Sequence, residues 1–137
     1  MSCVFMIKEE MEDPEEWYDK EIGCDKDWEY DKILMEYHTG SVYLIEEDDY
    51  TAFSDLSESL FVSWETSRWI ELAAGRELIY GYYSEDWLAA EFVHIKDGVC
   101  IRDYREYDRE VEEDYGEVPE FKSWVDVASY VDKYMPL

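Results

Sequence analysis

The sequence contains few basic residues, and this shortage limits what the protein can bind. Twelve Lys and Arg stand against 37 Asp and Glu, which gives a formal net charge of −25. Such a charge repels the phosphates of nucleic acids and the surfaces of anionic membranes. We therefore expect no nucleic-acid partner and no membrane partner, whereas a basic protein or a cation is favoured. Adaptation to high salt or to acid, or simple drift, would account for the same acidity.

Cysteine and long apolar runs are also scarce. Cys3, Cys24 and Cys100 are odd in number and far apart, so a disulfide framework is not expected. The apolar run at 3–7 has only five residues and is followed by acids, which is too short for a secretory signal or a membrane span. These features predict a reduced, cytoplasmic protein.

Signatures of catalysis are missing as well. Phosphate-binding glycine loops, the nucleophile elbow and the zinc-protease motif do not occur, and Cys and His never cluster at zinc-site spacing. The two histidines, His38 and His94, lie in predicted strands, where a packed or surface role is more common than that of a base. Glycosidases use a pair of carboxylates, but acids are so abundant in this sequence that finding such a pair does not indicate a glycosidase. We expect no enzyme, no catalytic residue, no cofactor and no metal site.

Residues 25–36 carry one pattern that must be weighed against this expectation. Acids occupy positions 1, 3, 5, 7 and 12 of a twelve-residue stretch, as in a calcium-binding EF-hand loop: Asp25, Asp27, Glu29, Asp31 and Glu36. Tyr30, however, stands where the turn of that loop requires glycine. Residues 32–38 also have the composition of a strand, whereas the EF-hand needs a helix there. The pattern does not predict a calcium site.

Aromatic residues, in contrast, are abundant. They make up 18% of the 137 residues, and hydrophobic residues make up 47%. A disordered acidic chain would contain few aromatic residues, so this composition indicates a folded protein with an acidic surface. The length corresponds to a single domain, 1–137, which is large enough to enclose one core.

Strand patterns dominate the chain. Runs at 77–83, 87–95 and 99–107 are separated by short turns and predict a three-stranded antiparallel meander. Residues 68–75 fit either a short helix capped by Ser67 or a strand, and we favour the strand because its neighbours are strands. Further strands are predicted at 2–8, 32–38, 41–47 and 60–65, with a hairpin turn at Thr39-Gly40.

Two segments have helical patterns. Apolar residues recur at helical spacing in 123–135, with Ser123 as N-cap, Asp126 completing a capping box and Pro136 ending the helix. Residues 13–22 predict a shorter helix with Asp13 as cap and Pro14 at its first position. The fold class is therefore α+β, an antiparallel sheet that contains the meander and carries the C-terminal helix on one face.

Acidic and aromatic residues occur together in three segments, 9–31, 46–50 and 104–117. Tyr and Trp are enriched at the energetic centres of protein interfaces, although the same rings would also anchor these segments to the core. We favour 104–117 for binding, because the meander holds Tyr104 and Tyr107 rigidly and rigid residues lose less entropy on binding. The predicted contacts to a basic protein are Tyr104, Glu106, Tyr107, Asp108, Glu110, Glu112, Glu113, Asp114 and Tyr115, assisted by Glu46, Glu47, Asp48 and Asp49.

The stretches LFVSWE (60–65), ELIYGYYSEDWLAAEFVHIKDG (77–98) and SWVDVASYVDKY (123–134) lie in a small, acidic α+β protein without a catalytic motif. As a class, such a protein resembles the immunity proteins of bacterial toxin systems. The resemblance implies a non-catalytic inhibitor that binds and neutralises a basic toxin, in many cases a nuclease. A DNA-mimicking anti-restriction inhibitor shares the charge and stays open as an alternative. An acidic enzyme or ligand-binding module that uses buried carboxylates is the alternative from another class.

Overall fold

The computed structural model describes residues 2–23, 42–58 and 60–135. These residues form seven strands and three helices. The strands are β1 (Ser2–Ile7), β2 (Val42–Glu46), β3 (Thr51–Asp55), β4 (Leu78–Ser84), β5 (Ala89–Lys96), β6 (Val99–Tyr107) and β7 (Glu110–Tyr115). The helices are α1 (Pro14–Glu21), α2 (Thr66–Ala73) and α3 (Trp124–Tyr134). Among the described residues, no helix is long and apolar enough to cross a membrane.

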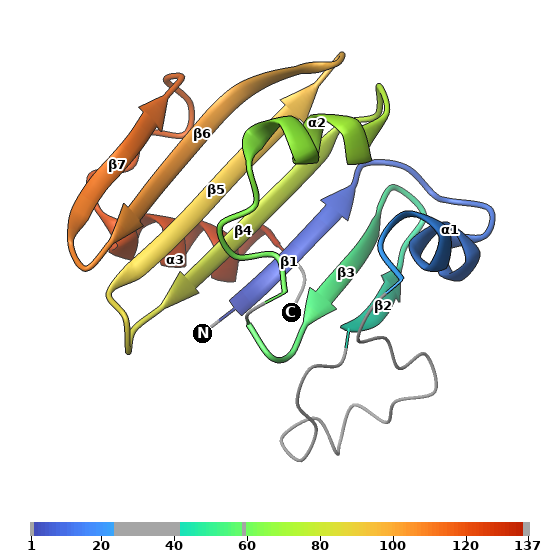
Figure 1. The fold of residues 1–137 in the computed structure, drawn as a ribbon, viewed down its shortest axis with the longest axis horizontal. Coiled ribbons are helices and arrows are strands. Elements are labelled where there is room, and N and C mark those ends of the chain that lie inside the picture. Colours follow the sequence, from blue (N-terminus) through green and yellow to red (C-terminus); the bar gives the residue numbers. More distant parts are fainter. Residues whose placement is uncertain (1, 24–41, 59, 136–137) are drawn as a thin grey trace.

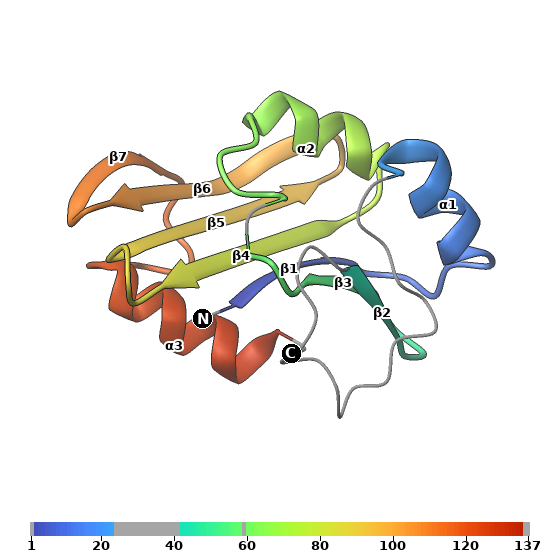
Figure 2. The ribbon, with the colours of Figure 1, turned by 60° about the horizontal axis from the view of Figure 1, so that its bottom comes forward.

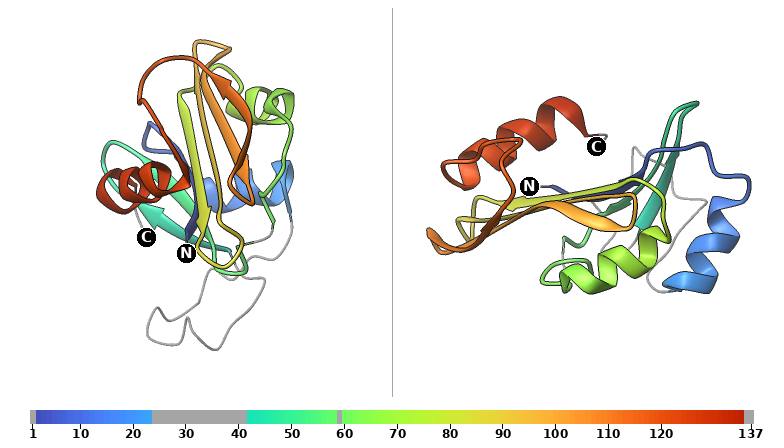
Figure 3. Two further views of the ribbon diagram at one scale, coloured as in Figure 1. Left: turned by 90° about the vertical axis from the view of Figure 1, so that its left-hand side faces the viewer. Right: turned by 90° about the horizontal axis from the view of Figure 1, so that it is seen from above.

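The strands form one antiparallel sheet in the order β2-β3-β1-β4-β5-β6-β7 (Figure 1). Helices α1 and α2 lie on one face of the sheet and α3 lies on the other (Figures 2 and 3). The α+β class, the β4–β5–β6 meander and the C-terminal helix on one face are therefore confirmed. The predicted strands at 2–8 and 41–47 and the predicted helix at 13–22 correspond to β1, β2 and α1.

The core has two halves, one on each face of the sheet, and β1 contributes to both. Phe5 and Ile7 belong to the cluster that α1 and α2 cover, whereas Val4 and Met6 belong to the cluster under α3. A central strand that is buried on both faces needs a continuous apolar run rather than an alternating pattern. This explains the short apolar run at 3–7.

Residues 66–73 form a helix, so the predicted strand at 68–75 is wrong. Trp69, Leu72 and Ala73 are buried at helical spacing, and the helix begins after Glu65 rather than after Ser67. The Trp69 ring stacks on Tyr80 of β4, with 4.4 Å between the ring centroids. Local propensity allowed either a helix or a strand here, and packing of this one helical face against the sheet favours the helix.

The predicted strand at 60–65 is also wrong. The apolar residues that suggested it, among them Phe61 and Trp64, are buried in the core from an irregular segment. The Asp55 carboxylate fixes the turn before it by accepting hydrogen bonds from the backbone N–H groups of Ser57 (2.9 Å) and Leu60 (2.7 Å). The predicted strand at 32–38 and its Thr39-Gly40 turn lie outside the described residues, as does Pro136.

Helix α3 begins as predicted at Ser123, whose Oγ accepts a hydrogen bond from the Val125 N–H. The predicted capping box differs in one bond, because the Asp126 carboxylate accepts from the Lys122 N–H (2.7 Å) instead of from Ser123. Val127 and Val131 are buried against the sheet. The helix lies close to β4 because that strand has a glycine, Gly81, beneath the helix.

Replacing this glycine, Gly81→Ala, should lower the free energy of unfolding by about 1–2 kcal/mol. The added Cβ would lie 2.7 Å from Cγ2 of Val131 and 2.8 Å from Sδ of Met135. Such overpacking costs roughly 1–3 kcal/mol and outweighs the ~0.4–1 kcal/mol gained from a less flexible unfolded chain. Urea denaturation measures the change. In a Met135→Ala background the loss should be smaller, and equal losses in both backgrounds would contradict the proposed contact.

Candidate protein-binding surface

Strand β7 forms one edge of the sheet and, within the described part of the chain, pairs only with β6 (Figure 1). All six of its residues are exposed, and four of them are acids: Glu110, Glu112, Glu113 and Asp114. An exposed edge offers unpaired backbone groups to other chains, and charged side chains restrict which chains can pair with it. The predicted acidic segment is therefore a strand edge along most of its length.

The turn between β6 and β7 explains why the sequence did not predict strand β7. Asp108 and Arg109 both have positive φ values, 52° and 66°, as in the two-residue type I′ turns of tight hairpins. Such turns usually contain Asn-Gly or Asp-Gly, because arginine rarely adopts this conformation. Without a glycine signal, the sequence predicts no strand after Tyr107.

The register of the hairpin divides the acids of β7 between the two faces of the sheet. Glu113 lies opposite Arg105, on the face that carries α2. Asp114 points to the α3 face, where its Oδ1 accepts from Nη1 of Arg102 at 2.7 Å. A register shift between 105 and 106 leaves Glu112 as an extra residue, and it faces the same hollow as Glu113. Within the described residues Glu112 and Glu113 thus form no ion pair on one face, while Asp114 stabilises the other.

Two of the predicted contact residues lie inside the protein and must be removed from the surface. Tyr104 is 1% exposed and Glu106 is 2% exposed, and the Tyr104 hydroxyl donates to Oε1 of Glu106 (2.6 Å). The Tyr104 ring also packs against Phe121 beneath α3. Tyr107 is half-buried, with its hydroxyl bonded to Glu91, and Asp108 is exposed. Both tyrosine hydroxyls are thus held by buried carboxylates, and the complete burial of Tyr104 removes it from any contact surface.

The second predicted segment, 46–49, lies at the opposite edge of the sheet. All four acids are exposed around the turn that joins β2 to β3. Six strand intervals of about 4.8 Å separate this edge from β7, or about 29 Å in all. Residues 46–49 therefore do not adjoin 104–117, and a partner that contacts both segments would have to extend across the sheet (Figure 1).

A fully buried carboxylate, Glu91 of β5, lies beside the β7 surface. Both of its oxygens accept from the Ser63 N–H at 3.0 Å, and Oε1 accepts from the Tyr80 hydroxyl at 2.7 Å. Its Oε2 accepts from the Tyr107 hydroxyl and lies 3.4 Å from Nη1 of Arg105. Four donors compensate for the loss of water around this charge.

Arg105 joins Glu91 to a second buried acid, Asp103. Its Nε donates to Oδ1 of Asp103 at 2.7 Å, and Oδ2 of Asp103 accepts from the Thr66 hydroxyl at the start of α2. Burial alone would lower the pKa of Arg105, but the hydrogen bond to Asp103 and the charges of both carboxylates raise it above its ordinary value. Burial and the Glu91 charge likewise raise the pKa of Tyr107, which therefore stays a neutral donor.

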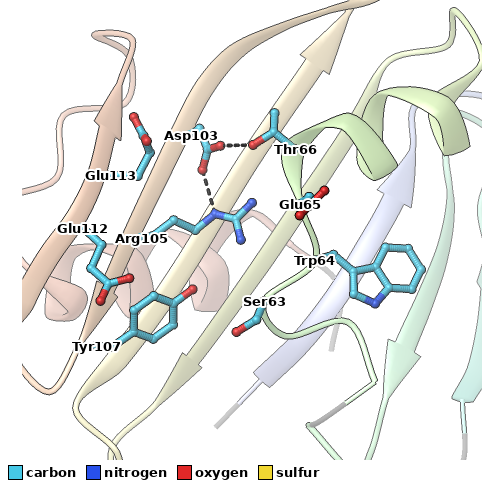
Figure 4. Close-up of a pocket in the computed structure, with 9 residues that line it drawn as sticks. All are labelled: Ser63, Trp64, Glu65, Thr66, Asp103, Arg105, Tyr107, Glu112 and Glu113. Carbon is cyan, nitrogen blue, oxygen red and sulfur yellow. Dashed lines mark hydrogen bonds and ion pairs between the residues drawn. The ribbon is translucent and has the colours of Figure 1, made fainter.

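An open pocket of about 500 Å³ lies above this buried cluster, between α2 and β7 (Figure 4). Glu112 and Glu113 enter it from β7 and Glu65 enters from the α2 side, with Arg105 between them. None of these three glutamates forms an ion pair with another described residue. The residues that line the pocket are Ser63, Trp64, Glu65, Thr66, Asp103, Arg105, Tyr107, Glu112 and Glu113.

The buried cluster was not predicted from the sequence, although one signal of it was present. In β5, Glu91 shares its face with Ala89, Val93 and Ile95, all of which are buried. A single acid in an otherwise apolar stripe either faces a cavity or meets buried donors. Its partner Arg105 gave no signal, because the surrounding acids made it look like an ordinary surface charge.

The other candidate sites do not converge on a reaction centre in the described part of the chain. Nε2 of His94 lies 2.6 Å from Oε2 of Glu77, but neither residue lines the pocket above Glu91. No group of three or more potential metal ligands occurs among the described residues. His38 and the calcium-like pattern at 25–36 lie outside these residues.

Comparisons with known proteins found no family model, no curated protein and no solved structure that matches this chain. A functional proposal must therefore rest on the surface itself, since a fold alone does not define a function.

Proposed function

We propose that this protein is a non-catalytic inhibitor that binds a basic protein, in the manner of an immunity protein that neutralises a toxin. The observation that supports this best is β7, an exposed edge strand on which Glu112 and Glu113 lack ion pairs among the described residues. Unpaired carboxylates on a rigid strand attract a basic surface and lose little entropy when it binds.

The buried carboxylates are the feature that an enzyme or ligand-binding module would use. Glu91 already accepts from four donors, and Asp103 accepts from Thr66 and Arg105. A general base needs a lone pair within reach of its substrate, and each of these oxygens already accepts at least one hydrogen bond within the fold, which disfavours that role. We therefore assign the cluster a supporting role beneath the binding surface.

Recovery of the partner is the first test. The tagged protein is expressed in its native cells and purified at low salt, and the captured protein is then produced separately for kinetic measurements. We expect a basic protein whose own activity falls when it is bound. A partner that normally binds DNA would favour the DNA-mimicking inhibitor, whereas a toxin encoded beside this gene would favour the immunity protein. Tight binding of an acidic protein would contradict the proposal.

Truncating Tyr115, by Tyr115→Ala, should speed dissociation of that partner by roughly tenfold or more, the change expected if its ring is an energetic centre of the interface. Tyr115 is 57% exposed on the same face of β7 as Glu113. Tyr134 of α3 has the same exposure and provides the matched control, Tyr134→Ala. Surface plasmon resonance gives the dissociation rates. If both variants dissociate alike, β7 is not the contact surface.

A further inference from the structure

The pocket above the buried cluster continues into a second hollow of about 450 Å³ on the same face of the sheet. The two share Thr66 at the start of α2, Asp103 of β6 and Glu113 of β7. Together they form one groove between α2 and the β6–β7 hairpin. Figure 2 shows that α2 lies over the middle of the sheet, so neither α1 nor α2, the two described helices on this face, covers the β7 edge.

The two ends of the groove differ in chemistry. One end has the carboxylates of Glu65, Glu112 and Glu113, which are exposed and unpaired among the described residues. The other end is lined by apolar groups, of which Val99 and Tyr115 are each 57% exposed. An acidic end next to exposed apolar surface is the arrangement expected for recognition of a cationic and an apolar side chain together.

Arg105 does not reverse the charge of the acidic end. Its Nε is bonded to Asp103 and its Nη1 lies near Glu91, so two buried carboxylates offset one guanidinium. An anionic ligand would meet the three rim glutamates as well as the net charge of −25. The same charge opposes a second copy of this chain. Complementarity therefore selects a cationic occupant.

From these features we propose that the groove receives a segment of the basic partner, with a cationic side chain at the acidic end and an apolar side chain against Val99 and Tyr115. The assignment rests on the proposed function and specifies what the partner must present. Glu113 and Tyr115 are two residues apart in β7, or about 6.8 Å. An extended segment reproduces this spacing with a cationic residue at one position and an apolar residue two positions later.

A capped tripeptide, acetyl-Arg-Ala-Leu-amide, serves as the probe because it needs no identified partner. It is titrated into the ¹⁵N-labelled full chain while the amide signals are followed by NMR. We expect saturable shifts centred on Thr66, Val99, Glu113 and Tyr115. Replacing arginine with citrulline, its neutral isostere, should weaken binding about threefold to tenfold, and replacing leucine with alanine should also weaken it.

The protein variants complete the test. Glu112→Gln/Glu113→Gln should weaken binding of the arginine peptide by up to the same factor, since Glu65 remains, but should leave binding of the citrulline peptide unchanged. Glu47→Gln/Asp48→Gln removes the same charge at the far edge of the sheet. It should leave binding of the arginine peptide nearly unchanged. The proposal is overturned if no shift saturates, if citrulline binds as well as arginine, or if the far-edge variant weakens binding equally.

Failure of the groove can be separated from failure of the proposed function. Suppose that the peptide does not bind, but that reversing the charge of Glu112 and Glu113 still slows association of the recovered partner. The proposal for the groove is then wrong, and the inhibitor proposal stands. If that partner associates normally with the charge-reversed protein, the inhibitor proposal fails at this surface, whatever the peptide does.

Discussion

Replacing Glu91 with alanine is expected to lower the free energy of unfolding by about 3–5 kcal/mol, the usual cost of removing one partner from a buried ion pair. Glu91 is completely buried and accepts from Ser63, Tyr80 and Tyr107 as well as lying beside Arg105. Its removal leaves these donors without their acceptor. Urea or thermal denaturation, followed by circular dichroism, measures the loss.

Two comparisons separate this mechanism from a general effect of mutation. Glu112→Ala removes an exposed acid close to the same cluster and should change stability by no more than about 0.5 kcal/mol. Glu91→Leu combined with Arg105→Met should lose less stability than the sum of the two single losses. Arg105→Met alone leaves two buried carboxylates, Glu91 and Asp103, without their cation, whereas the double variant leaves only Asp103. A loss below about 1 kcal/mol for Glu91→Ala would show that the cluster does not support the fold.

Much of the fold could be predicted because its patterns are local. The β4–β5–β6 meander has short turns between clear strand runs, and α3 has both a cap and a helical apolar stripe. Helix α2 could not be assigned in this way, since eight residues leave helix and strand nearly balanced until Trp69 packs on Tyr80. Tertiary contacts decided that segment.

The candidate surface was predictable only at the level of charge. A run of acids predicts an acidic surface, but the pairing register decides which acids face solvent. Glu106 enters the core beside Tyr104, and Asp114 pairs with Arg102, while Glu112 and Glu113 face the groove and pair with no described residue. The register shift in the β6–β7 hairpin causes this division, and no sequence signal marks that shift. Alternation by two residues is informative only while the register is regular.

The largest functional effect is expected from Glu112→Lys/Glu113→Lys, which should slow association with the basic partner by roughly tenfold to a hundredfold at low salt. The two acids face one groove and form no ion pair within the described residues, so reversing them changes the field that the partner meets without breaking a contact of the fold. Stopped-flow association at several salt concentrations measures the effect, and its salt dependence should become flatter. Asp114 is left unchanged because its pairing with Arg102 would confound the result.

The matched control is Glu47→Lys/Asp48→Lys, which changes the net charge by the same amount at the opposite edge of the sheet. About 29 Å separates the two edges, roughly three times the ~8–10 Å screening length at 0.1–0.15 M salt, so the far charges should have little influence on the β7 surface at those salt concentrations, where the two variants are compared. A partner that senses only the total charge would be slowed equally by both variants. Equal slowing would assign the acidity to solubility or to salt adaptation, whereas selective slowing by the β7 variant would place recognition at Glu112 and Glu113.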